Sequence, residues 1–240
     1  MVLYSISAFS QKAREYLGTG MVKHELMGDY RGAIADFDKA IEINPDLLMA
    51  YEQRSIVKKK LGDYRGAIAD CNIIIQRELN DNNAYDYNAY YTRGTAKEAL
   101  GYNREAIADY NKAIKISPYL SDAFIDRGNA KNKLEDYRGA IADYNKAIKI
   151  EPDLSISYYN RATSKNKLED YRGAIRDFSR AIKIDPDFLE AYYKRGVSKN
   201  ELGDYREAIQ DFNKVIQIDP NDTEAYIYRG VLKLRLGNKD

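Results

Sequence analysis

The 240-residue sequence is poor in the residue types that most often carry chemistry. It contains one cysteine, one histidine, no tryptophan and only five prolines. A single cysteine, Cys71, excludes an internal disulfide framework. With His24 as the one histidine, no Cys/His cluster has metal-ligand spacing, and Cys71 has no second histidine to activate it. No Gly-rich phosphate-binding loop occurs either. The composition therefore predicts a protein that is not an enzyme and uses no cofactor.

Charge and hydropathy disfavour further classes of protein. Lys and Arg number 38 against 37 Asp and Glu, so the net charge of +1 creates no overall field that would attract a polyanion. No apolar run approaches the ~18 residues that span a bilayer, and the N-terminus has no basic leader of the secretory type. We therefore expect a cytoplasmic protein with no transmembrane segment, and nucleic acid is disfavoured as its partner.

What the sequence does contain is a repeat of 34 residues. A turn of the type Gly-Asp-Tyr recurs with spacings of 34, 39, 34, 34 and 34 residues, starting at Gly28, Gly62, Gly101, Glu135, Glu169 and Gly203. After each turn comes Ala-Ile-x-Asp, usually followed by an aromatic residue and then by Ala and Ile. This spacing places the apolar residues on one face of a helix. A proline follows this second helix in five of six copies, and Gly or Ala recurs where two helices must approach closely.

This pattern resembles the tetratricopeptide repeat, in which an aromatic residue, Gly or Ala, Ala-x-x-x-aromatic and Pro recur at these spacings. The resemblance covers residues 14–240 and implies an all-α, right-handed superhelical solenoid of antiparallel helix pairs whose first helices line a concave groove. The aspartate or asparagine of each turn is expected to cap the second helix, and Glu207 to complete a capping box with Asp204. We predict one domain over residues 1–240, with repeats at about 14–47, 48–86 (including a loop insertion at about 78–86), 87–120, 121–154, 155–188 and 189–222, and a trailing helix at 223–237.

Two charged columns run along the predicted repeats. First helices carry an arginine on the packing stripe, and second helices carry an aspartate just before the core aromatic or Cys71. A buried charge needs a partner. Pairing each aspartate with the arginine of the following repeat uses all twelve residues, and the alternative is that the arginines are presented to acidic ligands. The predicted structural ladder is Asp36–Arg54, Asp70–Arg93, Asp109–Arg127, Asp143–Arg161, Asp177–Arg195 and Asp211–Arg229.

The resemblance implies a protein-interaction scaffold or adaptor that binds a peptide segment or a partner's surface in the groove. Rings would supply rigid apolar area, and amides would bond to a peptide backbone. For Asn132, Asn166 and Asn200, simple solvation is the alternative. The predicted contact residues are Tyr91, Thr95, Ile125, Asn129, Asn132, Tyr159, Asn160, Thr163, Asn166, Tyr193, Lys194 and Asn200.

Three further expectations concern partners. The carboxylate clamp of heat-shock co-chaperones is absent, because Glu52 and Ile56, for example, stand where paired Lys and Asn would be. Two alternatives stay open: a helical-repeat nucleic-acid-binding protein, against which groove acids such as Glu190 argue, and the interaction segment of a larger multidomain protein. The apolar trailing helix predicts self-association, with Leu232 and Leu236 left without a covering second helix.

Overall fold

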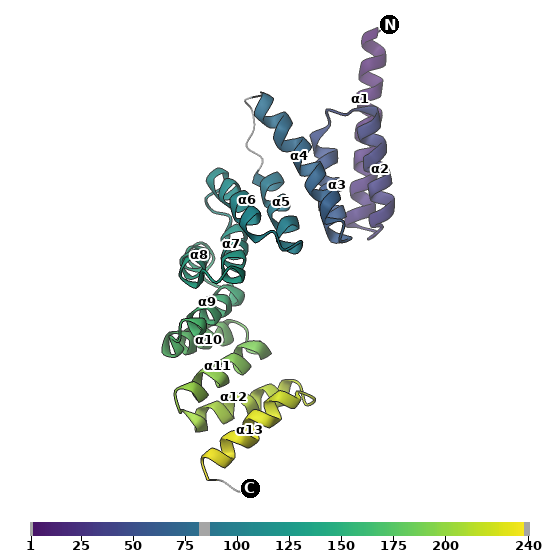
Figure 1. Ribbon diagram of the computed structural model, residues 1–240. Coiled ribbons are helices and arrows are strands. Elements are labelled where there is room, and N and C mark those ends of the chain that lie inside the picture. The colour runs from purple at the N-terminus through teal and green to yellow at the C-terminus, as the bar shows by residue number, and fades with distance from the viewer. Residues whose placement is uncertain (1, 82–86, 238–240) are drawn as a thin grey trace. The chain divides into compact units, whose positions relative to one another are not determined.

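The computed structural model describes residues 2–81 and 87–237, and within these ranges the chain forms helices and turns without a strand (Figure 1). The all-α fold expected from the repeat is confirmed. The first helices of successive pairs are α1 (Val2–Glu25), α3 (Leu48–Lys60), α5 (Tyr87–Ala99), α7 (Ser121–Lys133), α9 (Ser155–Lys167), α11 (Leu189–Glu201) and α13 (Thr223–Arg235). The second helices are α2 (Tyr30–Ile43), α4 (Tyr64–Asp81), α6 (Asn103–Ile116), α8 (Tyr137–Ile150), α10 (Tyr171–Ile184) and α12 (Tyr205–Ile218).

Internal contacts divide the chain into two compact units, Met1–Pro118 and Tyr119–Asp240. Within each unit, a first helix packs against its own second helix and also touches the first helix of the next pair, as α7 touches α9 and α9 touches α11. The first helices of one unit therefore form a common face. No helix in the described ranges is long and apolar enough to cross a membrane.

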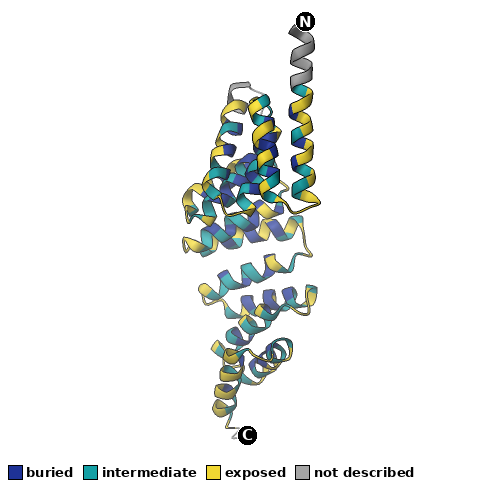
Figure 2. Cartoon of the chain, turned by 90° about the vertical axis from the view of Figure 1, so that its right-hand side faces the viewer, coloured by how far each residue is buried: buried dark blue, intermediate teal, exposed yellow. Residues whose placement is uncertain are grey.

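Each core is a row of rings that fill the space between paired helices. Phe37, Tyr110, Tyr144, Phe178 and Phe212 are fully buried, and the inward faces of the helices are correspondingly dark in Figure 2. The opposing first helix has a small residue at this level because the ring lies directly against its backbone. A Cβ on Gly128 would lie 2.7 Å from the ring of Tyr144, for example, which is closer than carbon atoms pack.

The turn between paired helices follows the predicted cap only where glycine stands at the third helical position. Asp136 accepts a hydrogen bond from the Gly139 N–H at 2.9 Å, and a Cβ at Gly139 would lie 2.0 Å from that carboxylate. The predicted capping box of Asp204 with Glu207 is wrong, because Asp204 makes no side-chain cap bond. A glutamate at the third position has a Cβ where this rotamer of aspartate needs open space.

The predicted loop at 78–86 is wrong in its first part. α4 continues as a helix to Asp81 and has 18 residues, against 14 in α6. The second repeat lacks the proline that follows the other second helices, so nothing in the sequence ends the helix at the usual point. The rest of the predicted loop, residues 82–86, lies outside the described residues.

The C-terminal helix α13 is partly covered by α12. Leu232, predicted to lack a cover, is 1% exposed and packs in a core cluster with Phe212 and Val215. That prediction was wrong because Leu232 points back toward the preceding pair. The exposed apolar residues of α13 lie on its other side and include Ile227, Val231 and Leu234.

Candidate functional site

The charged columns form compact triads inside the helix pairs from α3–α4 to α11–α12. On α9, Arg161 donates from Nε and Nη2 to the two carboxylate oxygens of Asp177, at 2.8 and 2.6 Å, and Lys165 lies 2.7 Å from the same carboxylate. The same arrangement recurs in five pairs, from α3–α4 to α11–α12. The triads are buried and hold paired helices together, so their arginines are not offered to a partner.

The predicted inter-repeat pairing is therefore wrong. Asp143 pairs with Arg127, sixteen residues earlier, and not with Arg161. The prediction assumed that every aspartate in one column pairs with an arginine of the other, whereas Asp36 in the first helix pair is paired with Lys23, at 2.6 Å. A lysine that recurs four residues after each arginine is the third member of each triad. Its spacing of four residues from the arginine was the available signal, since residues four apart share one face of a helix.

The predicted asparagines form hydrogen bonds between neighbouring first helices, in what we call the polar seam. Asn132 accepts a hydrogen bond from the Ser164 hydroxyl at 2.9 Å and donates to the Tyr144 hydroxyl at 3.0 Å. Asn166 donates to the Ser198 hydroxyl at 2.8 Å. These amides are already engaged within the protein, so only part of their bonding capacity is left for a peptide backbone.

Two further hydrogen bonds between first helices extend the polar seam. Asn160 donates to Asn129 at 3.1 Å, and Asn200 accepts from Arg235 on α13 at 3.0 Å. The serines at positions 164 and 198 were missed as functional partners. They follow Asn132 and Asn166 by 32 residues, and this repeated Asn/Ser spacing was the signal in the sequence.

Tyr159 and Thr163 lie one helical turn apart on α9. The Tyr159 ring packs against Phe178 and Phe188 at centroid distances of 5.7 and 4.9 Å, and the Thr163 hydroxyl donates to the Tyr159 carbonyl. Burial, with a contribution from nearby Glu190, raises the pKa of the Tyr159 hydroxyl. Tyr159 is only half-buried. One side of its ring packs against Phe178 and Phe188, and the other side is accessible to a partner.

Tyr193 occupies the same position on α11, one repeat later. Its ring packs edge-on against Phe212 and Tyr228, and its hydroxyl donates to the Glu224 carboxylate at 2.7 Å. Burial and then this bond to Glu224 raise the pKa of the Tyr193 hydroxyl. The ammonium of Lys194 lies 5.8 Å from the centroid of the same ring. The tyrosine is thus fixed in position, and Lys194 is exposed beside it.

Tyr91, Thr95 and Ile125, which are also predicted contact residues, lie outside α9 and α11. Tyr91 and Thr95 belong to the first unit, where Lys59 donates to the Thr95 hydroxyl at 3.1 Å and lies over the Tyr91 ring. Ile125 is 7% exposed, so it offers little surface to a partner. The predicted set is thus divided between two units, and its partly exposed residues in the second unit lie on α7, α9 and α11.

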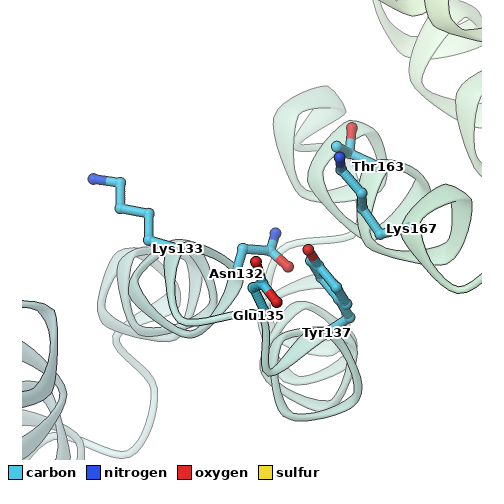
Figure 3. A pocket seen from close by; sticks show the side chains of 6 residues that line it. All are labelled: Asn132, Lys133, Glu135, Tyr137, Thr163 and Lys167. Atoms are coloured by element: carbon cyan, nitrogen blue, oxygen red, sulfur yellow. The ribbon is translucent and has the colours of Figure 1, made fainter.

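The second unit has an open cleft of about 340 Å³ beside Thr163 of α9 (Figure 3). Asn132 and Lys133 from α7, Thr163 and Lys167 from α9, and Glu135 and Tyr137 from the intervening turn and α8 line it. Figure 3 shows Lys133 directed away from the other five side chains, and Lys167 beside Thr163. The cleft thus presents an ammonium, a carboxylate and hydroxyl groups on the face of α9 that carries Thr163. Sequence reasoning did not select Lys167.

The residues that usually bind metals or act as nucleophiles are scattered over the described part of the chain. No group of three or more His, Cys, Asp or Glu side chains there could hold a metal ion. Cys71 is buried, and desolvation raises its pKa to about 11, so its thiol is a poor nucleophile.

Solved structures with the same fold include tetratricopeptide proteins. YrrB, described as a tetratricopeptide protein with an unusual peptide-binding site, is 20% identical, covers 81% of this chain and 97% of its own, and has a TM-score of 0.68. A tetratricopeptide protein from Parabacteroides merdae is 19% identical, with coverage of 95% and 88% and a TM-score of 0.74. MamA from Desulfovibrio magneticus is 20% identical, with coverage of 74% and 98% and a TM-score of 0.67. At these identities the likeness concerns the fold alone.

Sequence comparison with protein families is more specific. A family model described as the tetratricopeptide repeat matches residues 121–154, 155–188 and 189–222. A second model with the same description matches residues 24–47 and 87–119, so that together the two cover more than half of the chain. A search of curated proteins gave no significant match. The family matches, the helix pairs and the structural neighbours agree, and the chain belongs to the tetratricopeptide repeat family.

Proposed function

We propose that this protein is a non-enzymatic scaffold or adaptor that binds an extended peptide segment along the first helices of its second unit. The observation that carries the proposal is the row of half-buried side chains formed by Tyr159, Thr163, Tyr193 and Val197, beside the cleft that contains Lys167. An aromatic ring that already packs against the core on one side loses little conformational entropy when a partner binds its other side. Such rings are therefore favourable contact sites.

The charges beside the row define what the segment must satisfy. Lys167 on α9 and Lys194 on α11 are exposed cations, and Glu190 on α11 and Glu224 on α13 are exposed carboxylates. A peptide of mixed charge with apolar side chains fits this surface better than a phosphate backbone, which the carboxylates would repel. In this proposal the asparagines of the polar seam are mainly structural, because their hydrogen bonds hold neighbouring first helices at a fixed distance.

The proposal can be tested with peptides selected from a random display library on the immobilised 240-residue protein. Synthetic copies of the selected peptides would be labelled, and affinity measured by fluorescence anisotropy. Tyr159→Ala and Lys167→Glu should each weaken binding by about tenfold or more, because each removes a central contact. Lys146→Glu, a charge reversal on the exposed surface of α8, is the matched control and should leave affinity unchanged.

Circular dichroism would establish that all three variants are folded. Unchanged affinity in both Tyr159→Ala and Lys167→Glu would place the binding surface elsewhere. An equal loss in Lys146→Glu would show that the peptides respond only to overall charge.

A further inference from the structure

The second helix α10 carries a row of four cations on the side that faces away from the core. Arg172, Arg176, Arg180 and Lys183 are four, four and three residues apart, and this spacing places them within about 80° of one another around the helix. The buried residues of α10, which pack against α9, lie on the opposite side. Both neighbours of α10 in the repeat, α9 and α11, are already in contact with it, so no helix of the repeat remains to cover this row. We call it the cationic stripe.

The stripe is specific to α10 among the described second helices. Each of them has arginine at its second position, but the position of Arg176 is alanine in α2, α4, α6 and α8 and glutamine in α12. In the second unit, α8 has three of the four cations, and α12 has two with Glu207 beside them. The net charge of +1 for the whole chain therefore includes a local excess of positive charge that is centred on α10.

The cations of the stripe are not neutralised within the protein. Three of them are exposed and form no ion pair with residues 2–81 and 87–237. The fourth, Arg180, lies 3.6 Å from Asp153, which is 89% exposed, and a surface pair of this kind contributes little. The acidic residue of α10, Asp177, is buried in its triad with Arg161 and Lys165. The stripe thus has its positive charge available to a partner.

Two of these arginines occupy positions that disfavour the helix. Arg172 is the second residue of α10, where the helix dipole repels a cation, and the first turn contains no acidic residue to compensate. Arg176 lies four residues from both Arg172 and Arg180, and like charges at this spacing repel each other. Residues that oppose local stability without a gain in packing are expected at functional surfaces. The stripe is therefore better explained by an anionic partner than by the fold.

The two ends of α10 limit the kind of polyanion that fits. Glu169 and Asp170 precede the helix, Asp185 and Asp187 follow it, and all four are exposed. Between them the stripe is about 16 Å long, because each helical residue adds a rise of about 1.5 Å. A nucleic-acid strand lying along α10, or a flat anionic membrane, would extend past both ends and meet these carboxylates. About five extended residues of a polypeptide have the length of the stripe and would avoid them.

We propose that the cationic stripe on α10 binds a short run of aspartate and glutamate residues in another protein. Arginine suits this partner, because its guanidinium group can donate two parallel hydrogen bonds to one carboxylate. A second copy of the chain is disfavoured as the occupant, since Asp and Glu never occur three in a row in its 240 residues. The stripe faces away from α9 and α11, so this proposal and the preceding one can fail independently.

The test uses the 240-residue protein and a fluorescently labelled peptide with about five consecutive glutamates between Gly-Ser flanks. Anisotropy in low-salt buffer should show saturable binding below about millimolar protein, and a peptide with glutamine in place of glutamate should not bind. The double variant Arg172→Gln/Arg176→Gln should weaken binding about tenfold or more, because it removes two charged donors. Absence of saturable binding, or equal affinity in this variant, would overturn the proposal.

The matched control is Arg31→Gln/Arg65→Gln, which removes two exposed arginines from the second positions of α2 and α4 in the first unit and should leave the affinity unchanged. An equal loss in this control would show that the peptide responds only to total charge and would contradict the proposal. Thermal unfolding of Arg172→Gln/Arg176→Gln should show the same or a higher Tm, because repulsion is relieved. A lower Tm would mean that these arginines serve the fold, contrary to the inference.

Two competing polyanions complete the test. A single-stranded oligonucleotide of the same charge as the peptide, and vesicles that contain phosphatidylserine, should both bind more weakly than the glutamate peptide. Tighter binding of the oligonucleotide, lost in Arg172→Gln/Arg176→Gln, would assign the stripe to nucleic acid. The same result with vesicles would assign it to a membrane surface, and either result would contradict the proposal.

Discussion

Asp143 on α8 and Arg127 on α7 form a two-point ion pair within a single helix pair, with Nε–Oδ2 and Nη2–Oδ1 distances of 2.9 and 2.5 Å. Lys131 lies 2.8 Å from the same carboxylate, whose side chain is 4% exposed. The single carboxylate thus pairs with two cations that have little access to water. Burying charges is costly, so the intact triad adds little net stability. Removing one member is strongly destabilising, because it leaves the other charges buried without a partner.

Replacing Asp143 by alanine should lower the free energy of unfolding by about 3–5 kcal/mol, because Arg127 and Lys131 would be left buried beside each other without a carboxylate. Denaturant titration followed by circular dichroism measures this change. Asp153→Ala is the control, since Asp153 is 89% exposed and lies 3.6 Å from Arg180, and it should cost less than about 1 kcal/mol. Equal effects of the two substitutions would contradict a buried triad.

Alanine at Gly128 and at Gly230 should have opposite effects on stability. At Gly128 the new Cβ would press on the Tyr144 ring, whose hydroxyl is bonded to Asn129 and Asn132, so we expect a net loss of about 1 kcal/mol. At Gly230 the space is open, and alanine should gain about 0.5–1 kcal/mol by its helix propensity. Thermal unfolding of the two variants provides the comparison, and a shift of the same sign in both would refute the packing argument.

Two turns have glutamate where the others have glycine, and they are strained. Glu135 and Glu169 have φ values of +63° and +60°, a left-handed conformation that costs a non-glycine residue roughly 1–2 kcal/mol. Glu135→Gly and Glu169→Gly should therefore each stabilise the protein by about 0.5–1 kcal/mol in denaturant titration. Gly62→Ala, at φ +82°, is the mirror-image control and should destabilise by a similar amount. If both glutamate replacements destabilised the protein, the glutamate side chains would contribute more stability through their contacts than the backbone strain costs.

Cys71 should resist alkylation in the native protein. Burial raises the pKa of its thiol to about 11, so at pH 8 only about one molecule in a thousand carries the reactive thiolate. The pKa is raised, so reactivity should increase as the pH rises toward 11 or when denaturant returns the thiol to its ordinary pKa. The rate of reaction with iodoacetamide measures this, and equal rates at pH 8 with and without denaturant would be inconsistent with a buried thiol.

The polar seam illustrates how far the sequence can be interpreted without coordinates. Asn132 and Asn166 are recognisable as a column on the face of the first helices, because a period of 34 residues places them there. Whether they face water, a peptide or a neighbouring helix depends on how closely consecutive first helices approach. Ser164 and Ser198 reach the amides because the helices are in contact, and that distance is a property of packing in three dimensions.

By itself, the sequence determined the helix pairs, the caps that depend on glycine, the small residues opposite the rings and the charged columns, because these follow from local spacing and residue size. The tertiary structure alone decided which charges pair. Asp143 is sixteen residues from Arg127 and eighteen from Arg161, and only the rotation of α8 about its axis selects between them. The structure likewise decided that Leu232 is covered while Ile227 and Leu234 on the same helix are exposed, because the burial of a helix face depends on which helices pack against it.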